Sequence, residues 1–372
     1  MRIQSFTWFV LAITLWGCSH DDTPSPESEE PSSVPDFIAL GEDLEHVYQY
    51  EYHAATEGET LIDLTGGDAI GNQFISLRQD GEILTFYTFS AGSFSATQRN
   101  VRTGAIRTLE DIYQISDDRS VIWGTISEEK LYFGYYSPRG SDNFGMRIVD
   151  IATKSVKDMP LEAHAQNVYE PLYYNGKLFV TYLTSKGDYR TVLVDDATSG
   201  ILRTWDFGPH VPSFFIDEAG DIALITGLDG NNYQYTIYDF DTLEKLSETP
   251  FSVDRFFAPG PLQAEFIGDK LYYLNYYAQP SPIPYGPAIY DFILGENRIL
   301  DIIGIVHDLQ LEKGGAITLT AHRYSPQGKA FLFGYASDFN NGRFEGGILV
   351  ISEDGTLIKN IETSFVPIYF LE

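Results

Sequence analysis

The sequence predicts an all-β protein, a β-propeller with seven four-stranded blades. Residues 168–208 form a pattern of four short strands joined by turns, which is the content of one blade. Similar turns recur along the chain roughly every 45 to 60 residues, within the range of propeller repeats. The chain is 15% aromatic and 21% charged, with many Tyr and Phe residues that suit strands.

The clearest single blade begins with a strand at 169–174 and the tight turn Asn175-Gly176. Such a pair favours the positive φ angles of a two-residue hairpin. The remaining strands are predicted at 178–183, 189–194 and 201–207. This blade serves as the template for the rest of the chain.

The turn between the third and fourth strands is the most recognisable repeat. Seven copies are found, and they indicate seven blades. They are Ala55-Thr56-Glu57-Gly58, Arg102-Thr103-Gly104-Ala105, Ala152-Thr153-Lys154-Ser155, Ala197-Thr198-Ser199-Gly200, Asp241-Thr242-Leu243-Glu244, Leu294-Gly295-Glu296-Asn297 and Glu353-Asp354-Gly355-Thr356.

Six blades are predicted to be continuous in sequence, and the seventh is predicted to be composite. Residues 47–64 would supply its outer two strands and residues 365–370 an inner one, which closes the ring without exposed edges. Because three strands are found for this blade, six or eight blades stay open. The continuous blades are expected at about 70–111, 119–161, 166–207, 211–250, 261–303 and 316–362.

No stretch after the N-terminal segment has a helical period over ten or more residues, so no helix is predicted. A β-sandwich or a string of small β domains is the structural alternative. The regular period and the absence of linkers after residue 36 favour one propeller domain at 37–372.

The first residues predict a signal peptide at 1–17, with a basic Arg2 and a short apolar run. Leu15-Trp16-Gly17-Cys18 resembles the lipobox of bacterial lipoproteins, which implies cleavage before Cys18 and acylation of its thiol. The alternative is a free thiol near an ordinary cleavage site. Cys18 is the single cysteine, which excludes a disulfide within the chain.

Residues 18–36 carry the lipidated cysteine and a tract rich in Pro, Ser and Glu, which predicts a disordered acidic tether. Acidic residues directly after the cysteine resemble the surface-export signal of some diderm bacteria. We therefore expect a lipid anchor in the outer membrane, at the cell surface or otherwise on its periplasmic face. The net charge of −29 argues against a nucleic-acid partner.

Basic residues recur in the connections between blades, which in a propeller lie together around the channel mouth. They are spaced roughly 45 to 52 residues apart, as expected for one position in each blade. These candidate ligand-binding residues are Arg119, His164, His210, Arg255 and His307.

The loops after the second strands lie on the same rim and add further candidates. Aromatic faces and Arg forks together suit a planar, anionic or polyhydroxylated ligand, such as a metal–catecholate chelate, a glycan or a peptide. The alternative is that these aromatic side chains shield blade edges and the basic ones balance nearby acids. The candidates are Tyr136, Arg139, Tyr277, Tyr285 and Arg343.

No metal site, cofactor or catalytic residue is predicted. Histidines in separate blades do not imply a shared metal, and 53 acidic residues prevent the choice of a glycosidase pair. The stretch from Asp196 to Trp205 resembles the repeat of quinoprotein-like propellers, in which the tryptophan docks adjacent blades. That resemblance implies a packing role for Trp205 and no quinone.

Taken together, the lipobox, the acidic tether and the propeller resemble surface lipoproteins found beside TonB-dependent transporters of the outer membrane. One branch of these captures ferric siderophores and passes them to the transporter. The resemblance implies a lipid-anchored binding protein with a small-molecule ligand and a transporter partner, and no catalysis. A carbohydrate-active lyase or hydrolase, or a non-catalytic scaffold subunit, are the alternatives.

Overall fold

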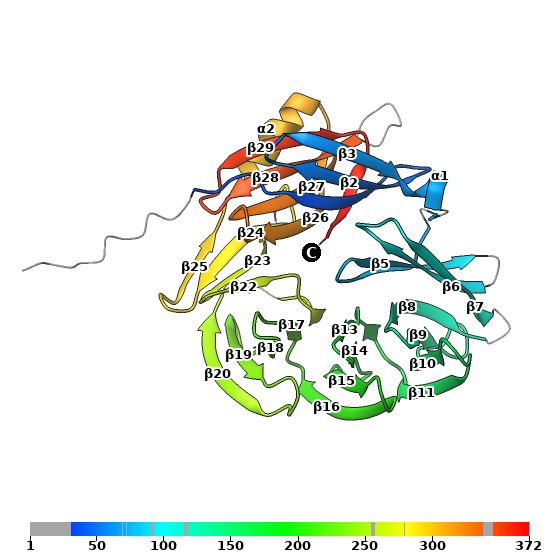
Figure 1. Ribbon diagram of the computed structural model, residues 1–372. Helices are drawn as coiled ribbons and strands as arrows, with labels where there is room; N and C mark the ends of the chain where they lie inside the picture. Colours follow the sequence, from blue (N-terminus) through cyan, green and yellow to red (C-terminus); the bar gives the residue numbers. More distant parts are fainter. Residues whose placement is uncertain are drawn as a thin grey trace, which may run out of the picture. The chain divides into compact units, whose positions relative to one another are not determined.

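The computed structural model describes residues 31–68, 70–71, 73–90, 93–114, 118–253, 257–278, 280–337 and 345–371. Residues Ser32–Glu372 form one compact unit. Within its described part, seven small antiparallel sheets are arranged in a ring around a common axis (Figure 1). The predicted fold class and blade number are confirmed. Cys18, Arg255 and Arg343 lie outside the described residues.

The first three blades are continuous in sequence. Blade 1 contains β4 (Ser76–Asp80), β5 (Ile83–Ser90), β6 (Ser93–Asn100) and β7 (Ile106–Gln114). Blade 2 contains β8 (Ser120–Ile126), β9 (Lys130–Tyr136), β10 (Phe144–Asp150) and β11 (Val156–Glu162). Blade 3 contains an interrupted inner strand, β12 (Asn167–Val168) and β13 (Leu172–Tyr174), followed by β14 (Lys177–Leu183), β15 (Tyr189–Asp195) and β16 (Gly200–Gly208).

The next three blades follow the same order. Blade 4 contains β17 (Pro212–Ile216), β18 (Ile222–Gly227), β19 (Asn232–Tyr238) and β20 (Lys245–Ser252), and β21 (Gly260–Pro261) adds to it in parallel beside β17. Blade 5 contains β22 (Glu265–Ile267), β23 (Lys270–Tyr276), β24 (Tyr285–Asp291) and β25 (Glu296–Ile299). Blade 6 contains β26 (Ile317–Ser325), β27 (Ala330–Ser337), β28 (Glu345–Ser352) and β29 (Leu357–Thr363).

Blade 7 is composite, as predicted, and it has four strands. From the outside inwards they are β3 (Gly58–Asp63), β2 (Val47–His53), β1 (Phe37–Glu42) and β30 (Val366–Phe370). The strand β1 was not predicted because its apolar stretch is short and acidic residues follow it directly. A short helix, α1 (Leu64–Asp68), follows β3.

Aromatic and aliphatic side chains fill the spaces between blades. The described residues contain seven core clusters, and each one joins two consecutive blades. The two seams of the composite blade are among them: Tyr50 packs with Leu332 of blade 6, and Leu40 packs with Phe86 of blade 1. The ring is therefore closed by the same apolar burial that joins every other pair of blades. Trp205 lies in the seam of blades 3 and 4, in agreement with its predicted packing role.

The two ends of the blades differ, and two names are used for them below. The hairpin end holds the turns from the inner to the second strand, such as Gly81–Glu82, and the turns from the third to the fourth strand. The loop end holds the connections between blades and the loops from the second to the third strand, such as 137–143. Each inner strand runs from the loop end to the hairpin end.

The repeated turn is confirmed at the hairpin end of each blade. In blade 2 the Asp150 carboxylate accepts the Thr153 main-chain N–H at 2.7 Å, and the Lys154 N–H donates to the Asp150 carbonyl. One residue of each turn has a positive φ angle, which a glycine adopts at least cost. These residues are Glu57, Gly104, Lys154, Ser199, Leu243, Gly295 and Gly355.

Lysines at the start of some second strands tie one blade to the next turn. Lys130 donates to the Asp196 and Ala197 carbonyls, and Lys177 donates to the Phe240 carbonyl at 2.9 Å. A cation suits these sites because the turn presents several carbonyl oxygens together. The third-to-fourth turns therefore also hold neighbouring blades together.

One prediction about the fold is wrong: the connection before blade 6 is a helix, α2 (Ile303–Lys313). Val306 and Leu309 are buried between blades 5 and 6, whereas Leu311 is exposed. Apolar residues are thus not confined to one face, which removes the periodic signal on which helix prediction depends. The helix ends at Gly314, whose φ is 70° and whose N–H donates to the Gln310 carbonyl.

The N-terminal segment joins the ring at the hairpin end. Ser33 donates its N–H to the Gly328 carbonyl at 2.8 Å, and the Ser32 hydroxyl donates to the Lys329 carbonyl at 2.7 Å. Both acceptors belong to the turn between β26 and β27. The chain therefore enters the propeller beside blades 6 and 7, at the end opposite to the predicted rim.

Candidate functional site

All eight predicted site residues that the structure describes lie at the loop end. They belong to three settings: a cluster in blade 2, packed tyrosines in blade 5, and connections elsewhere on the ring. His210 lies in the connection between blades 3 and 4 and is partly buried, whereas His307 is exposed on α2. The predicted rim is thus the loop end of the ring, but its residues make different kinds of contact.

Arg119 serves inside blade 2. Its Nη2 lies 2.9 Å from Asp158 Oδ2, and its guanidinium stacks 4.8 Å from the Tyr135 ring centre. Arg147 donates to the same carboxylate from Nε at 2.8 Å. Burial raises the pKa of Asp158, but the Arg147 hydrogen bonds and the two guanidinium charges outweigh it, so the pKa is lowered. The main role of Arg119 is therefore to pair with Asp158 inside blade 2.

Tyr277 and Tyr285 pack between blades 5 and 6. The Tyr277 hydroxyl donates to the Leu300 carbonyl at 3.0 Å, and the Tyr285 hydroxyl donates to the Leu319 carbonyl at 3.1 Å. Burial raises the pKa of Tyr277 to about 12. Both hydroxyls are engaged with the main chain, which leaves the ring edges as the surface that a ligand could meet.

Tyr136, Arg139 and His164 gather around the loop between β9 and β10, and they form what we call the blade 2 cluster. His164 Nδ1 lies 2.8 Å from Asp142 Oδ1, and both side chains are more than half exposed. Arg139 is exposed, and its main-chain N–H donates to Asp118 Oδ1 at 3.2 Å. Burial and the Asp142 charge raise the pKa of Tyr136. This cluster combines the Tyr136 ring, the Arg139 guanidinium, the His164 imidazole and the Asp142 carboxylate on an open surface.

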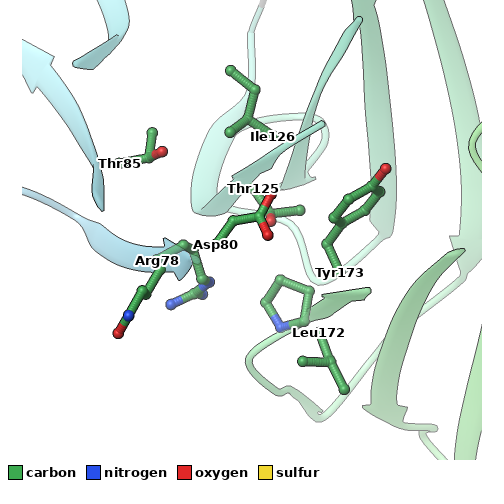
Figure 2. A pocket seen from close by; sticks show the side chains of 9 residues that line it. Arg78, Asp80, Thr85, Thr125, Ile126, Leu172 and Tyr173 are labelled. Atoms are coloured by element: carbon green, nitrogen blue, oxygen red, sulfur yellow. The ribbon is translucent and has the colours of Figure 1, made fainter. Parts of the chain in front are cut away.

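A recess in the channel wall lies at the hairpin end, and the sequence analysis did not find it. Its volume is about 370 Å³, including the open space at its mouth. Figure 2 shows Arg78 and Thr85 on one side of the recess and Leu172 and Tyr173 on the other. Three consecutive blades supply its walls: Arg78, Gln79, Asp80, Thr85, Thr125, Ile126, Pro171, Leu172 and Tyr173.

Arg78 is the central charge of this recess. Its side chain is 21% exposed and pairs through Nη2 with Glu170 of blade 3, while Nη1 donates to the Leu77 carbonyl at 2.7 Å. Within the described residues, Nε is shielded from solvent and lacks a hydrogen-bond partner. Burial lowers the pKa of the Arg78 guanidinium to about 10.

The signal that could have revealed the recess is a basic residue within an inner strand. Inner strands line the channel, and the Ser76-Leu77-Arg78-Gln79-Asp80 strand carries three polar side chains in succession. Site residues were predicted only in connections and loops, whereas this recess is lined by inner strands, which face the axis.

Two solved structures resemble this chain at low sequence identity. No protein-family model and no curated protein matches the chain. TolB from Acinetobacter baumannii shares 13% identity over 90% of this chain and 81% of its own, with a TM-score of 0.43. A protein from Lactobacillus plantarum shares 12% identity over 91% of this chain and 100% of its own, with a TM-score of 0.51. This chain is a seven-bladed β-propeller.

Membrane-spanning helices and metal-binding groups are both absent from the described residues. None of their helices is long and apolar enough to cross a membrane. None of their His, Asp and Glu side chains form a group of three or more that could hold a metal ion.

Proposed function

We propose that the protein is a lipid-anchored binding protein of the bacterial cell envelope. Lipid on Cys18 would hold it in the outer membrane, and the loop end of the propeller would capture a ligand for a partner transporter. A rigid, preformed surface suits this role because little ordering is needed when the ligand binds.

The position of the N-terminal segment is the observation that supports this proposal best. Ser32 and Ser33 bind the hairpin end of blade 6. An anchor that precedes Ser32 would draw this end towards the membrane, so the loop end would be presented to ligands and partners. The residues proposed for capture lie at that presented end.

The blade 2 cluster is the first place to test ligand binding. Tyr136 offers an aromatic face, Arg139 offers charge-assisted donors and His164 offers an imidazole, which together suit a catecholate chelate or another anionic or polyhydroxylated molecule. His210 and His307 lie at the same end in other connections. A ferric siderophore is the specific ligand that we propose, and a TonB-dependent transporter is the proposed partner.

The test is titration of the purified protein with ferric catecholate siderophores, followed by tryptophan fluorescence. The double variant Arg139→Ala/His164→Ala should weaken binding by about 10-fold or more, because each charged hydrogen bond contributes roughly 1.5–3 kcal/mol at most. Lys154→Ala, at the exposed hairpin end, is the matched control and should bind like the parent protein. Equal binding by all three proteins would reject capture at this cluster.

The anchoring half of the proposal has its own measurement. Cys18→Ser should move the protein from the membrane fraction to the soluble fraction, because acyl chains supply the membrane affinity. A Cys18→Ser protein that stays with the membrane would show that another part of the chain holds it there.

A further inference from the structure

The recess at the hairpin end contains an arginine whose charge is poorly matched. Arg78 is largely buried, whereas its ion-pair partner Glu170 has a side chain that is 64% exposed. A buried guanidinium is costly unless its donors are satisfied, and an exposed carboxylate on one side satisfies it incompletely. Within the described residues, the buried Nε remains without a hydrogen-bond partner.

A second buried donor lies next to the recess. The Tyr87 side chain is 0% exposed. It lies close to Thr85 and Thr125, two hydroxyl-bearing residues of the recess wall. Buried polar groups normally have partners, so the unpartnered Arg78 Nε–H indicates room for an acceptor in the recess.

The remaining wall limits what that acceptor can be. Ile126, Pro171 and Leu172 provide an apolar side, while Asp80 adds a negative charge near Arg78. A compact apolar group would fit the apolar side, and the Asp80 charge disfavours ligands with several negative charges.

We propose that this recess binds a small organic monocarboxylate, with its carboxylate on Arg78, and that Glu170 takes that place when no ligand is bound. Arg forks match carboxylates in a two-bond geometry. Glu170 lies between β12 and β13, at the break in the inner strand of blade 3. It is thus a carboxylate that can leave Arg78 without disturbing a strand ladder.

This site is separate from the loop-end cluster, so the proposal stands without the siderophore hypothesis. It predicts opposite effects for the two partners of one ion pair. Removal of the Glu170 charge should strengthen carboxylate binding because the internal competitor is lost. Removal of the Arg78 charge should abolish binding because the ligand loses its counter-ion.

The experiment is calorimetric titration of the full-length protein in detergent with butyrate and benzoate, and with butyramide as the uncharged match. The parent protein should bind the carboxylates and release no heat with butyramide. Glu170→Gln should bind butyrate about 10-fold more tightly, and Arg78→Gln should show no binding. Lys186→Gln, on the exposed loop of blade 3, should behave like the parent.

Arg78→Gln could fail to fold, so Thr125→Val provides a second variant of the recess wall and should weaken butyrate binding by about 3-fold to 10-fold. The proposal is overturned if butyrate and butyramide bind equally, if neither binds, or if Glu170→Gln leaves the affinity unchanged. A parent protein that binds butyrate but no ferric siderophore would reject the loop-end function and leave this site standing.

Discussion

At the scale of single residues, several side chains have chemistry that depends on their neighbours more than on their type. His322 in β26 packs beside the rings of Tyr285 and Phe333, with ring centres 6.1 and 6.4 Å away. Burial lowers its pKa from 6.5 to about 4, against a smaller opposing effect from the Gln263 main chain. The imidazole is therefore neutral in the folded protein at neutral pH.

This histidine predicts a loss of stability in mild acid. The unfolded chain binds a proton near pH 6.5 and the folded chain near pH 4, so stability is present above pH 6.5 and is lost as the pH falls towards 4. The expected loss is on the order of 3 kcal/mol for this group. Urea unfolding at pH 7.5 and 4.5 should show a smaller pH difference for His322→Gln than for the parent.

His53→Gln is the matched control because His53 is exposed at the end of β2. It should keep the pH dependence of the parent protein. An identical pH difference in His322→Gln and the parent would show that other groups set the acid sensitivity.

At the scale of elements, the third-to-fourth turn is the unit that the sequence displays most clearly. An Asp or Asn starts many of its copies and caps the main-chain N–H groups that follow, as Asn100 caps Thr103 at 2.7 Å. This local chemistry is visible without an alignment, which is why seven turns could be recognised. The strand β1 lacks such marks, and the helix α2 has Asp301 and Gly314 at its ends but no apolar period between them.

The turns also predict a gain in stability. Lys154 is exposed and has φ of 59°, a conformation that costs an L residue roughly 1–2 kcal/mol. Lys154→Gly should raise the free energy of unfolding by about 0.5–1 kcal/mol after the greater chain entropy of glycine is subtracted. Thermal and urea unfolding will measure it.

The reverse change in blade 1 is the control. Gly104 has φ of 70°, and a Cβ there would approach nothing closer than Arg99 Nη2 at 3.9 Å. Gly104→Ala should therefore lower stability through the backbone alone, by about 1 kcal/mol. The turn argument fails if both substitutions change stability in the same direction.

At the scale of the whole molecule, closure by strands from distant parts of the sequence is the central feature. β30 pairs with β1, and the Phe365 side chain before it is 1% exposed against Tyr50 of β2. The Thr320 hydroxyl and the Arg323 guanidinium of blade 6 donate to carbonyls of this C-terminal segment. The segment therefore joins blades 6 and 7 as well as completing one of them.

A chain that stops after Ser364 should fail to form a stable ring. It loses a whole inner strand and buried Phe365, Val366 and Phe370, a loss comparable to the 5–15 kcal/mol that stabilises a typical domain. Circular dichroism should show no cooperative thermal transition near that of the parent. A chain that starts at Ser32 should melt like the parent, because Ser32–Glu372 form one compact unit.

The sequence predicts the features that depend on short stretches of the chain, and it does not predict those that depend on contacts between distant residues. Blade repeats and their turns are local, so the architecture and the composite seventh blade followed from the residues. The uses of Arg119 and Tyr277 were not predictable, because Asp158 and the Leu300 carbonyl reach them only through strand register. The recess around Arg78 depends on three blades meeting, which no single stretch of sequence records.

The meeting of both chain ends in blade 7 has a consequence for engineering. The Leu371 N–H donates to the Ile38 carbonyl at 3.0 Å, so the two ends of the folded ring are adjacent. A short linker from Leu371 to Phe37, with new termini opened in an exposed connection such as Gly208–Val211, would give a circular permutant that keeps every ladder. A tether added at the new terminus would then attach the ring through a blade of choice, and ligand binding could be measured for each point of attachment.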